Sequence, residues 1–161
     1  MKKIFILAVC VFFAAAIAYT EEYFHDDAGI SMWFPDSWEV SIESQNYIFA
    51  THPTGEVGIL YLVFDADEIE TKLDALDKEL ENLVDDLEMI EDSMSEETLN
   101  GMNAMVTAAT GTAGGIPVNI GVILVATPNE KVLLIVGMIE AEKYDEHEKI
   151  LDEILGRVKP L

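Results

Sequence analysis

The 161-residue chain carries 31 aspartates and glutamates against 9 lysines and arginines, and its formal net charge at neutral pH is −22. A field of this sign repels the phosphates of nucleic acids and of anionic lipid surfaces, so the charge argues against both classes of partner. Basic proteins and cations remain as partners that the charge would attract.

The first residues have the pattern of a secretory signal peptide. Two lysines follow the first methionine, residues 4–17 are continuously apolar, and Ala16-Ile17-Ala18 offers a small-x-small cleavage site. We therefore predict a signal peptide over residues 1–18, cleavage near Ala18, and a periplasmic or secreted mature chain that no membrane holds.

Two other interpretations of the same segment fit less well. An uncleaved membrane anchor needs about 20 apolar residues, more than this segment supplies. A lipoprotein site at Cys10 would follow Val9, which is not a small residue. Because Cys10 is the only cysteine, the mature chain has no thiol for disulfides, thiolate metal sites or nucleophilic catalysis.

The first half of the mature chain alternates in the manner of strands. Residues 20–27 form a polar lead-in, and residues 30–34 predict a strand that the following proline ends. Two short strands are expected at residues 39–43 and 47–51. Residues 55–64 are apolar in both alternating sets, which predicts a central strand covered on both faces.

The period then changes to that of a helix. Over residues 67–87 the apolar side chains recur every three or four residues, which predicts an amphipathic helix whose stripe comprises Ile69, Leu73, Leu76, Leu80, Leu83 and Leu87. Residues 65–97 also hold 15 carboxylates and only two lysines. We interpret most of these acids as the solvated face of the helix, with diffuse cation binding near Asp85, Asp86 and Glu88.

A meander of strands follows the helix. Residues 88–99 are ambiguous between loop and short strand, and Asn100-Gly101 is a hairpin turn signal before a strand at residues 102–112. Residues 116–139 then read as two strands joined at Pro128-Asn129, and the second is apolar on both faces. This pattern predicts a second central strand.

A second helix is expected over residues 142–155, ended by Gly156, with His147 on its inward face. The order of elements predicts an α+β fold: one domain over residues 19–161 with a mostly antiparallel sheet of about six strands and two amphipathic helices.

Four stretches of the mature chain resemble the PsbP-like family. They are residues 29–38 (GISMWFPDSW), residues 99–106 (LNGMNAMV), the GGIPV hairpin at residues 114–118, and the terminal segment from Tyr144 to Pro160. The family includes the extrinsic PsbP protein of photosystem II, nuclear Ran-binding relatives and secreted bacterial members of undefined role. The resemblance implies an α/β/α sandwich and an accessory or binding role. It carries over no catalytic residue, and no photosystem-specific or Ran-specific motif accompanies it.

The sequence contains none of the constellations that hydrolytic catalysis requires. There is no G-x-S-x-G or S-x-x-K motif, and the run that begins at His147 places Leu151 where a zinc protease has its second histidine. His147 therefore reads as a half-buried helix residue and His52 as a loop residue. The glycine-rich residues 111–115 lack the lysine of a phosphate loop and precede a strand. We predict no catalytic residue, no cofactor and no dedicated metal site.

Two further acidic motifs contain metal-competent side chains but do not have the pattern of a metal site. His25-Asp26-Asp27 reads as solvated lead-in, because adjacent residues of regular structure do not converge on one ion. Residues 65–70 lack the central glycine of an EF-hand loop.

The predicted function is binding. Trp33 and Trp38 flank Phe34-Pro35, and either pack in the core or anchor a partner. Two strands apolar on both faces need cover, and if both helices packed on one face, the other would require a protein partner or a second copy of the chain. We therefore expect an exported, non-enzymatic accessory protein that binds a partner; the alternative is a divalent-cation or small-ligand binding protein that uses the acidic residues 65–97.

Overall fold

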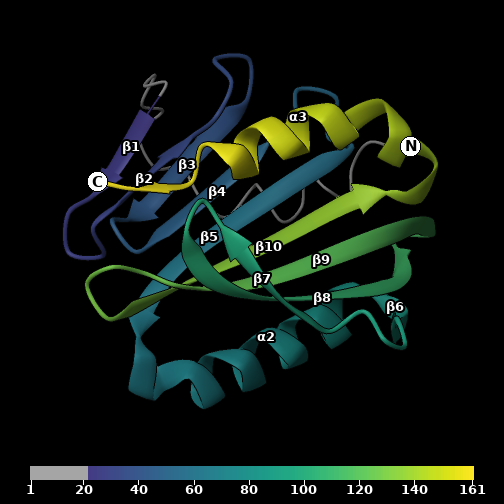
Figure 1. Cartoon of the computed structure of the whole chain (residues 1–161). Coiled ribbons are helices and arrows are strands. Elements are labelled where there is room, and N and C mark those ends of the chain that lie inside the picture. The colour runs from purple at the N-terminus through teal and green to yellow at the C-terminus, as the bar shows by residue number, and fades with distance from the viewer. Residues whose placement is uncertain (1–21) are drawn as a thin grey trace.

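The computed structural model describes residues 22–161, which form two antiparallel sheets and two α-helices (Figure 1). The large sheet has the strand order β3-β4-β5-β10-β9-β8-β6, and β7 pairs with the same edge of β8 as β6 does. Its strands are β3 (Glu39–Ser44), β4 (Tyr47–Thr51), β5 (Val57–Asp65), β6 (Asp85–Met89), β7 (Ser95–Leu99), β8 (Met102–Ala113), β9 (Ile116–Ala126) and β10 (Lys131–Glu140).

A second sheet of three strands lies beside it. Its members are β1 (Glu22–His25), β2 (Ile30–Trp33) and β11 (Lys159–Pro160), in the order β1-β2-β11. The helices are α2 (Ile69–Leu83) and α3 (Tyr144–Gly156), each preceded by a short 3-10 turn, η1 (Ala66–Glu68) and η2 (Ala141–Lys143).

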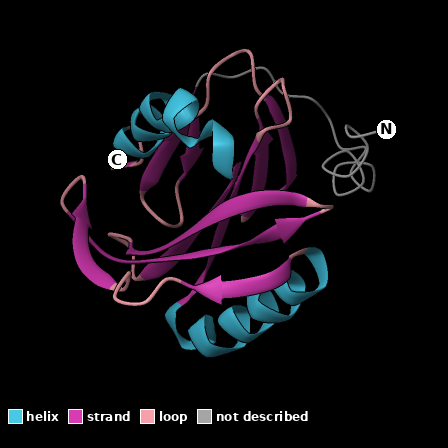
Figure 2. Cartoon of the chain, turned by 90° about the vertical axis from the view of Figure 1, so that its right-hand side faces the viewer, coloured by secondary structure: helices cyan, strands magenta, loops and turns pink. Residues whose placement is uncertain are grey.

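The large sheet lies between the two helices (Figures 1 and 2). Helix α2 covers one face, and α3 together with the small sheet covers the other. This arrangement confirms the predicted α+β class and the α/β/α sandwich. The two helices do not pack on the same face of the sheet. Each face has one helix, so neither face is wholly open.

The central positions of β5 and β10 follow from their sequences. The two strands pair with each other over the full length of β5, and β9 pairs with the other edge of β10. Alternate side chains of β10 enter opposite cores: Leu133 and Ile135 face the α3 side, and Leu134 and Val136 face the α2 side. A strand with two buried faces has no position for a polar side chain, which is why its sequence is continuously apolar.

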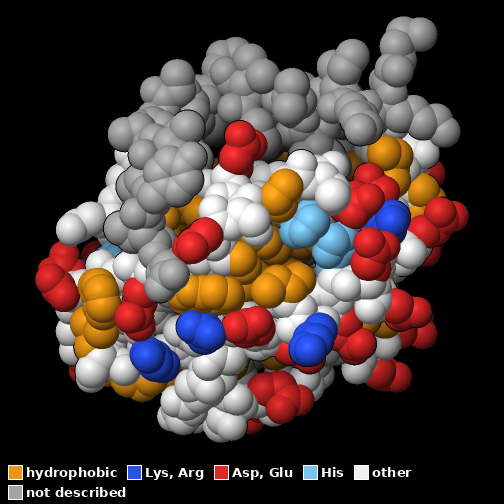
Figure 3. All heavy atoms as spheres, turned by 90° about the horizontal axis from the view of Figure 1, so that it is seen from above, with side chains coloured by type: hydrophobic (Ala, Val, Ile, Leu, Met, Phe, Trp, Pro, Cys, Tyr) orange, Lys and Arg blue, Asp and Glu red, His pale blue; other side chains and the backbone are white. Residues whose placement is uncertain are grey.

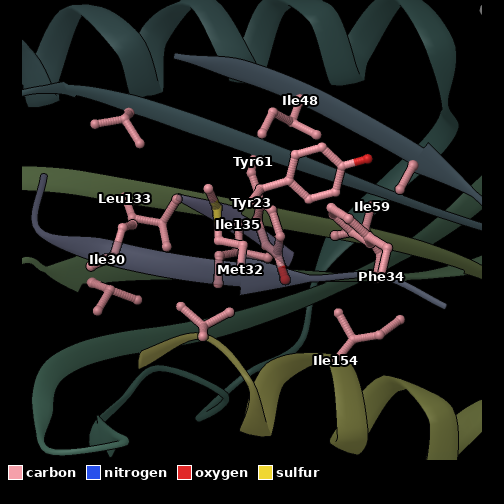
Figure 4. Close-up of a cluster of buried hydrophobic side chains, with 14 of the residues drawn as sticks. Tyr23, Ile30, Met32, Phe34, Ile48, Ile59, Tyr61, Leu133, Ile135 and Ile154 are labelled. Carbon is pink, nitrogen blue, oxygen red and sulfur yellow. The ribbon is translucent and has the colours of Figure 1, made fainter. Parts of the chain in front are cut away.

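The α3-side core is the larger of the two. Side chains from both sheets and from α3 meet there, and Figure 4 shows Phe34, Met32 and Tyr61 between Ile154 of α3 and the strands of the large sheet. The Phe34 ring packs against the rings of Tyr23 and Tyr61, with centroids 5.8 and 5.2 Å apart. These aromatic contacts join the small sheet to the large one.

Both predicted turns are present. Asn100 and Gly101 have φ values of 50° and 86°, the left-handed pair that a two-residue hairpin requires. At the β9–β10 connection, the N–H of Glu130 donates to the carbonyl of Thr127 across Pro128-Asn129.

The first helix is shorter than predicted. It ends at Leu83, since Val84 has extended backbone angles and Asp85 already pairs with Thr112 of β8. Leu87 continues the apolar stripe from within β6, where it packs against the same α2-side core. Leu87, four residues after Leu83, reaches the same core from a strand as it would from a continued helix. The spacing of the apolar residues alone therefore did not mark the helix end.

The sheets hold more strands than the predicted six. The polar lead-in contains β1, the ambiguous residues 88–99 contain the end of β6 and β7, and β11 follows the stop of α3. Their pairing partners β2 and β8 define these short strands, and the sequences of the strands themselves are too short or too polar to show the period. His25, which the sequence places in a solvated lead-in, is buried.

The predicted signal peptide and its cleavage site lie outside the described residues. Within residues 22–161, no helix combines the length and the apolar character that a membrane span needs.

Candidate functional site

Two histidines and a glutamate meet at one end of the α3 layer. His52 directly follows β4, Glu56 directly precedes β5, and the residues between them form a tight turn. The N–H of Gly55 donates to the carbonyl of His52 at 2.8 Å, and the φ of Gly55 is 75°, a conformation that glycine adopts without a steric penalty. His147 comes from the first turn of α3 and is only 5% exposed.

We call these three residues, His52, Glu56 and His147, the His–Glu cluster. Nε2 of His147 lies 2.8 Å from Oε2 of Glu56, and the His52 and His147 ring centroids are 4.5 Å apart. The hydroxyl of Thr54 bridges His52 and Glu56: it lies 2.8 Å from Nδ1 of His52 and 2.8 Å from Oε2 of Glu56. One ligand atom from each member of the cluster lies within 4.8 Å of the other two.

The cluster sets the protonation of its members. Hydrogen bonds from His147 and then Thr54 hold the pKa of Glu56 below its ordinary value, and Lys143, whose Nζ is 3.6 Å from Oε1, acts in the same direction. Burial, and then the neighbouring His147 ring, lower the pKa of His52. At neutral pH the cluster therefore presents a carboxylate and a neutral His52 imidazole.

An apolar cavity of about 160 Å³ lies between α2 and the large sheet. Leu76 and Leu80 of α2 line one side and Val136 and Met138 of β10 the other. The polar groups in its wall are few and mostly acidic: Tyr47, Glu56, Glu79 and Glu140. Burial raises the pKa of Tyr47, and the nearby Glu79 and Glu43 raise it further.

A third feature is an edge of the large sheet that is both acidic and rich in methionine. We call residues 85–97 together with Met105 the acidic edge. Residues 85–97 hold seven carboxylates and no lysine or arginine. The same residues and Met105 contribute four of the seven large hydrophobic side chains that are exposed among residues 22–161: Met89, Ile90, Met94 and Met105.

The register shows which face these methionines occupy. Met89 pairs with Ala109, and Ala109 belongs to the α2-side core, so both side chains point to the α2 side of the sheet. Met105 is four residues before Ala109 on β8 and lies on the same face. The α2-covered face therefore continues past the helix as an exposed strip. Met94, the residue before β7, is 67% exposed.

Comparison with known proteins rests on structure alone, because no family model and no curated protein matches the sequence. The solution structure of cyanobacterial PsbP (CyanoP) from Synechocystis sp. PCC 6803 is similar with a TM-score of 0.60 and 10% identity, over 92% of this chain and 96% of that chain. LpqN, involved in cell envelope biogenesis of Mycobacterium tuberculosis, is similar with a TM-score of 0.58 and 19% identity, over 81% of this chain and 82% of that chain. The Saccharomyces cerevisiae Ran-binding protein Mog1p is similar with a TM-score of 0.52 and 10% identity, over 89% of this chain and 95% of that chain.

The chain has the PsbP/Mog1-like fold. The resemblance read from the sequence is confirmed at the level of fold. The chain also matches a Bacteroides thetaiotaomicron protein with a TM-score of 0.58 and 12% identity over 89% of its own length, and there it spans about half, 49%, of the other chain.

Within the PsbP/Mog1-like fold, the two tryptophans have different neighbours. Trp38 is buried, with its ring stacked on Phe34 at 6.5 Å and edge-on to His52 at 5.6 Å. Trp33 is half-buried under the guanidinium of Arg157, 4.1 Å from the ring centroid. Trp38 thus links the core to the His–Glu cluster, and Trp33 keeps one side near solvent.

The predicted cation ligands Asp85, Asp86 and Glu88 are exposed on β6. Asp86 has a φ of 52° at an irregular step in the pairing with β8, so the three carboxylates do not follow one another on a regular strand. Among residues 22–161, the group whose ligand atoms converge closely enough for a metal ion is the His–Glu cluster, and these three acids are not part of it. Diffuse cation binding at β6 stays a prediction.

Sequence reasoning missed Glu56 and the exposed methionines. His147 is correctly inward, but the search for its partner covered only the same helix, and the partner comes from a turn 91 residues earlier. The methionines did leave a signal, since Met89, Ile90 and Met94 interrupt an acidic run at positions where a solvated segment has no use for apolar side chains.

Proposed function

We propose that this chain is an exported accessory protein of a bacterial envelope that binds a protein partner through its acidic edge and has no catalytic activity of its own. The observation that carries the proposal is the coincidence, in one segment, of exposed apolar side chains and uncompensated negative charge. Exposed apolar patches on a protein surface mark sites of association.

Export is supported by the basic, apolar and small-residue pattern of residues 1–18. LpqN, which has the same fold, is involved in cell envelope biogenesis. Fractionation of host cells, followed by mass spectrometry of the intact chain, tests the point: export with processing near Ala18 gives a mature chain that begins at Tyr19. An unprocessed chain in the cytoplasmic fraction would contradict export.

The chemistry of the acidic edge specifies the partner. Methionine side chains are flexible and polarisable, so they adapt to apolar groups of varied shape. The seven carboxylates around them favour a segment that carries lysine or arginine, and they raise its rate of encounter. The partner is therefore a protein with a cationic and apolar segment. A second copy of this chain is disfavoured, because two strongly acidic chains would bring like charges together.

Position-specific photo-crosslinking in the host tests this proposal. A photoreactive phenylalanine analogue replaces Met94 or Met105 in the acidic edge, and Asp152, exposed on α3, serves as the matched control position. We expect the same adduct from the first two positions and none from Asp152. The yield should fall when Glu96→Gln and Glu97→Gln remove charge from the edge.

Two results would contradict the proposal. Equal adducts from all three positions would mean that the edge confers no selectivity, and the absence of adducts from an exported, folded protein would mean that the edge binds nothing. Adducts that persist after the charge is removed would argue against a cationic partner.

A second candidate function is binding of a small apolar ligand in the cavity under α2. The specific observation is the apolar lining, to which Leu76, Leu80 and Leu83 of the acidic segment contribute. Fluorescence of a bound apolar probe, lost in a Val136→Phe variant that fills the cavity, would support this function. Probe binding unchanged by that variant would remove it.

A further inference from the structure

The His–Glu cluster combines three metal-competent side chains that the fold assembles from two distant segments. His52 and Glu56 bracket the β4–β5 turn, and His147 approaches from α3. The turn is fixed by its own backbone bonds, His52 to Val57 at 2.9 Å and Gly55 to His52 at 2.8 Å. A helix and a tight turn hold their side chains more firmly than long loops do, as a binding site requires.

The donor atoms fit one class of ion. Two imidazole nitrogens and one carboxylate oxygen are the ligands of zinc sites with three protein ligands, and they also suit nickel, copper and ferrous iron. Calcium and magnesium prefer oxygen ligands only, so the two histidines argue against those ions. We propose that His52, Glu56 and His147 bind a divalent transition-metal ion of the zinc class.

The geometry needs little adjustment to accept the ion. Around a tetrahedral zinc with bonds of about 2.0–2.1 Å, two ligand atoms lie roughly 3.3 Å apart. In the cluster, Nε2 of His147 and Oε2 of Glu56 are 2.8 Å apart, and all three ligand atoms lie within 4.8 Å of one another. His52 is in a turn and only half-buried, so a small rotation of its ring can complete the site.

The surroundings provide the hydrogen bonds that orient metal ligands. Thr54 contacts both His52 and Glu56, and Lys143 pairs with Oε1 of Glu56, the carboxylate oxygen that does not face His147. Glu146 in turn pairs with Lys143 at 2.8 Å, which reduces the repulsion between the lysine and a bound cation. His52 and Glu56 are only half-buried, so an ion has access from solvent. Figure 3 shows histidine side chains at the surface next to acidic and basic groups.

A purely structural role for these residues makes a different prediction. An ion pair between Glu56 and His147 would hold α3 to the turn, but it has no need of a second imidazole 4.5 Å away. If the residues have only this structural role, the unaltered protein binds no metal ion at the cluster, and His52→Ala has no metal affinity to remove. The role of His52 therefore separates the two interpretations.

Calorimetric titration of the purified, chelator-treated protein with Zn²⁺ tests the proposal. We expect one ion per chain, and a rise in Tm of roughly 8 °C when free Zn²⁺ is 100 times the Kd. Each of His52→Ala, Glu56→Gln and His147→Gln should weaken the affinity by about 100-fold or more. Cobalt(II) should give the visible absorption of a tetrahedral nitrogen-and-oxygen site in the unaltered protein and not in the variants.

The controls separate this site from general attraction to negative charge. Glu148→Gln, an exposed residue of α3 outside the cluster, and Asp86→Asn, on the acidic edge, should keep the affinity and the single-ion stoichiometry. His52→Ala alters a half-buried turn residue, so it keeps the test valid if His147→Gln does not fold. Binding that survives His52→Ala, several weak ions per chain, or no binding up to about 100 µM metal, an affinity of only about −5.5 kcal/mol, would overturn the proposal.

Discussion

Helices of similar length cover the two faces of the large sheet, yet the layers beneath them are packed differently. On the α3 side, twenty buried side chains form one cluster, because the small sheet closes the area that the helix leaves. On the α2 side, nine buried side chains form the cluster, and α2 itself buries only Leu80. The cavity under α2 and the exposed strip beyond it both lie on this second side.

The difference teaches where this fold can accept ligands. A single amphipathic helix is narrower than the sheet it covers, so the α2 side keeps apolar surface that a ligand or partner can still bury. On the α3 side the small sheet covers part of the area beside the helix and the buried cluster is larger, and the His–Glu cluster lies at the rim of this layer. The following substitutions test this comparison between a closely packed layer under α3 and a layer under α2 that keeps spare apolar surface.

Truncation of a buried side chain under each helix gives the largest expected effect. Ile154→Ala on α3 removes a fully buried side chain from a closed core and should cost about 4 kcal/mol of unfolding free energy, whereas Leu80→Ala, beside a space that already exists, should cost about 2 kcal/mol. Urea unfolding of both variants measures the two losses of unfolding free energy. Equal costs would mean that the two layers are equally well packed.

The hydroxyl of Tyr61 gives the next effect, and its sign is opposite. Tyr61 is buried in the α3-side core, and its Oη has no hydrogen-bond partner. An unpartnered buried polar group costs about 1–3 kcal/mol, so Tyr61→Phe should raise the unfolding free energy by about 1 kcal/mol. A loss of stability on urea unfolding would show that the hydroxyl is satisfied and that this core is less dry than its packing indicates.

The sequence predicted the parts of this architecture that depend on local pattern. β5 and β10 were recognised as central because both of their faces are apolar, and α3 because its apolar stripe and terminal glycine agree. β1 and β11 were missed, because each exists only through pairing with β2. A two-residue strand has no period to detect.

The candidate sites were less predictable for the same reason. The His–Glu cluster depends on a contact between residues 91 positions apart, and neither partner carries a local motif for it. The sequence left Trp38 either in the core or at the surface as an anchor, and its stacking on Phe34 depends on how the small sheet folds back. Sequence pattern specifies which faces are buried, and the tertiary fold decides which polar groups meet.

A cavity-filling pair sharpens the comparison further. Val136→Ile adds one methylene toward the cavity on the α2 side and should raise the unfolding free energy by up to about 0.8 kcal/mol. Val125→Ile makes the same change in the closed α3-side core, where overpacking should cost about 1 kcal/mol or more. Thermal unfolding of the two variants gives the signs, and two losses would argue that the cavity is not available to a side chain.

Alkaline titration of the tyrosines gives the smallest effect and compares the two layers without altering packing. Burial raises the pKa of both Tyr61 and Tyr47, and Glu79 and Glu43 add to the shift at Tyr47. Because the folded chain keeps these protons above pH 10 while the unfolded chain releases them, the stability they contribute is complete below the unfolded pKa of about 10 and is lost as the pH rises above it.

Tyr61, enclosed on the α3 side, should ionise only when the protein unfolds. Tyr47, at the wall of the cavity, should ionise late but reversibly in the folded state. Ultraviolet difference titration of the protein and of its Tyr47→Phe and Tyr61→Phe variants assigns the two steps, and simultaneous ionisation of both tyrosines would show that the α2 side is as closed as the α3 side.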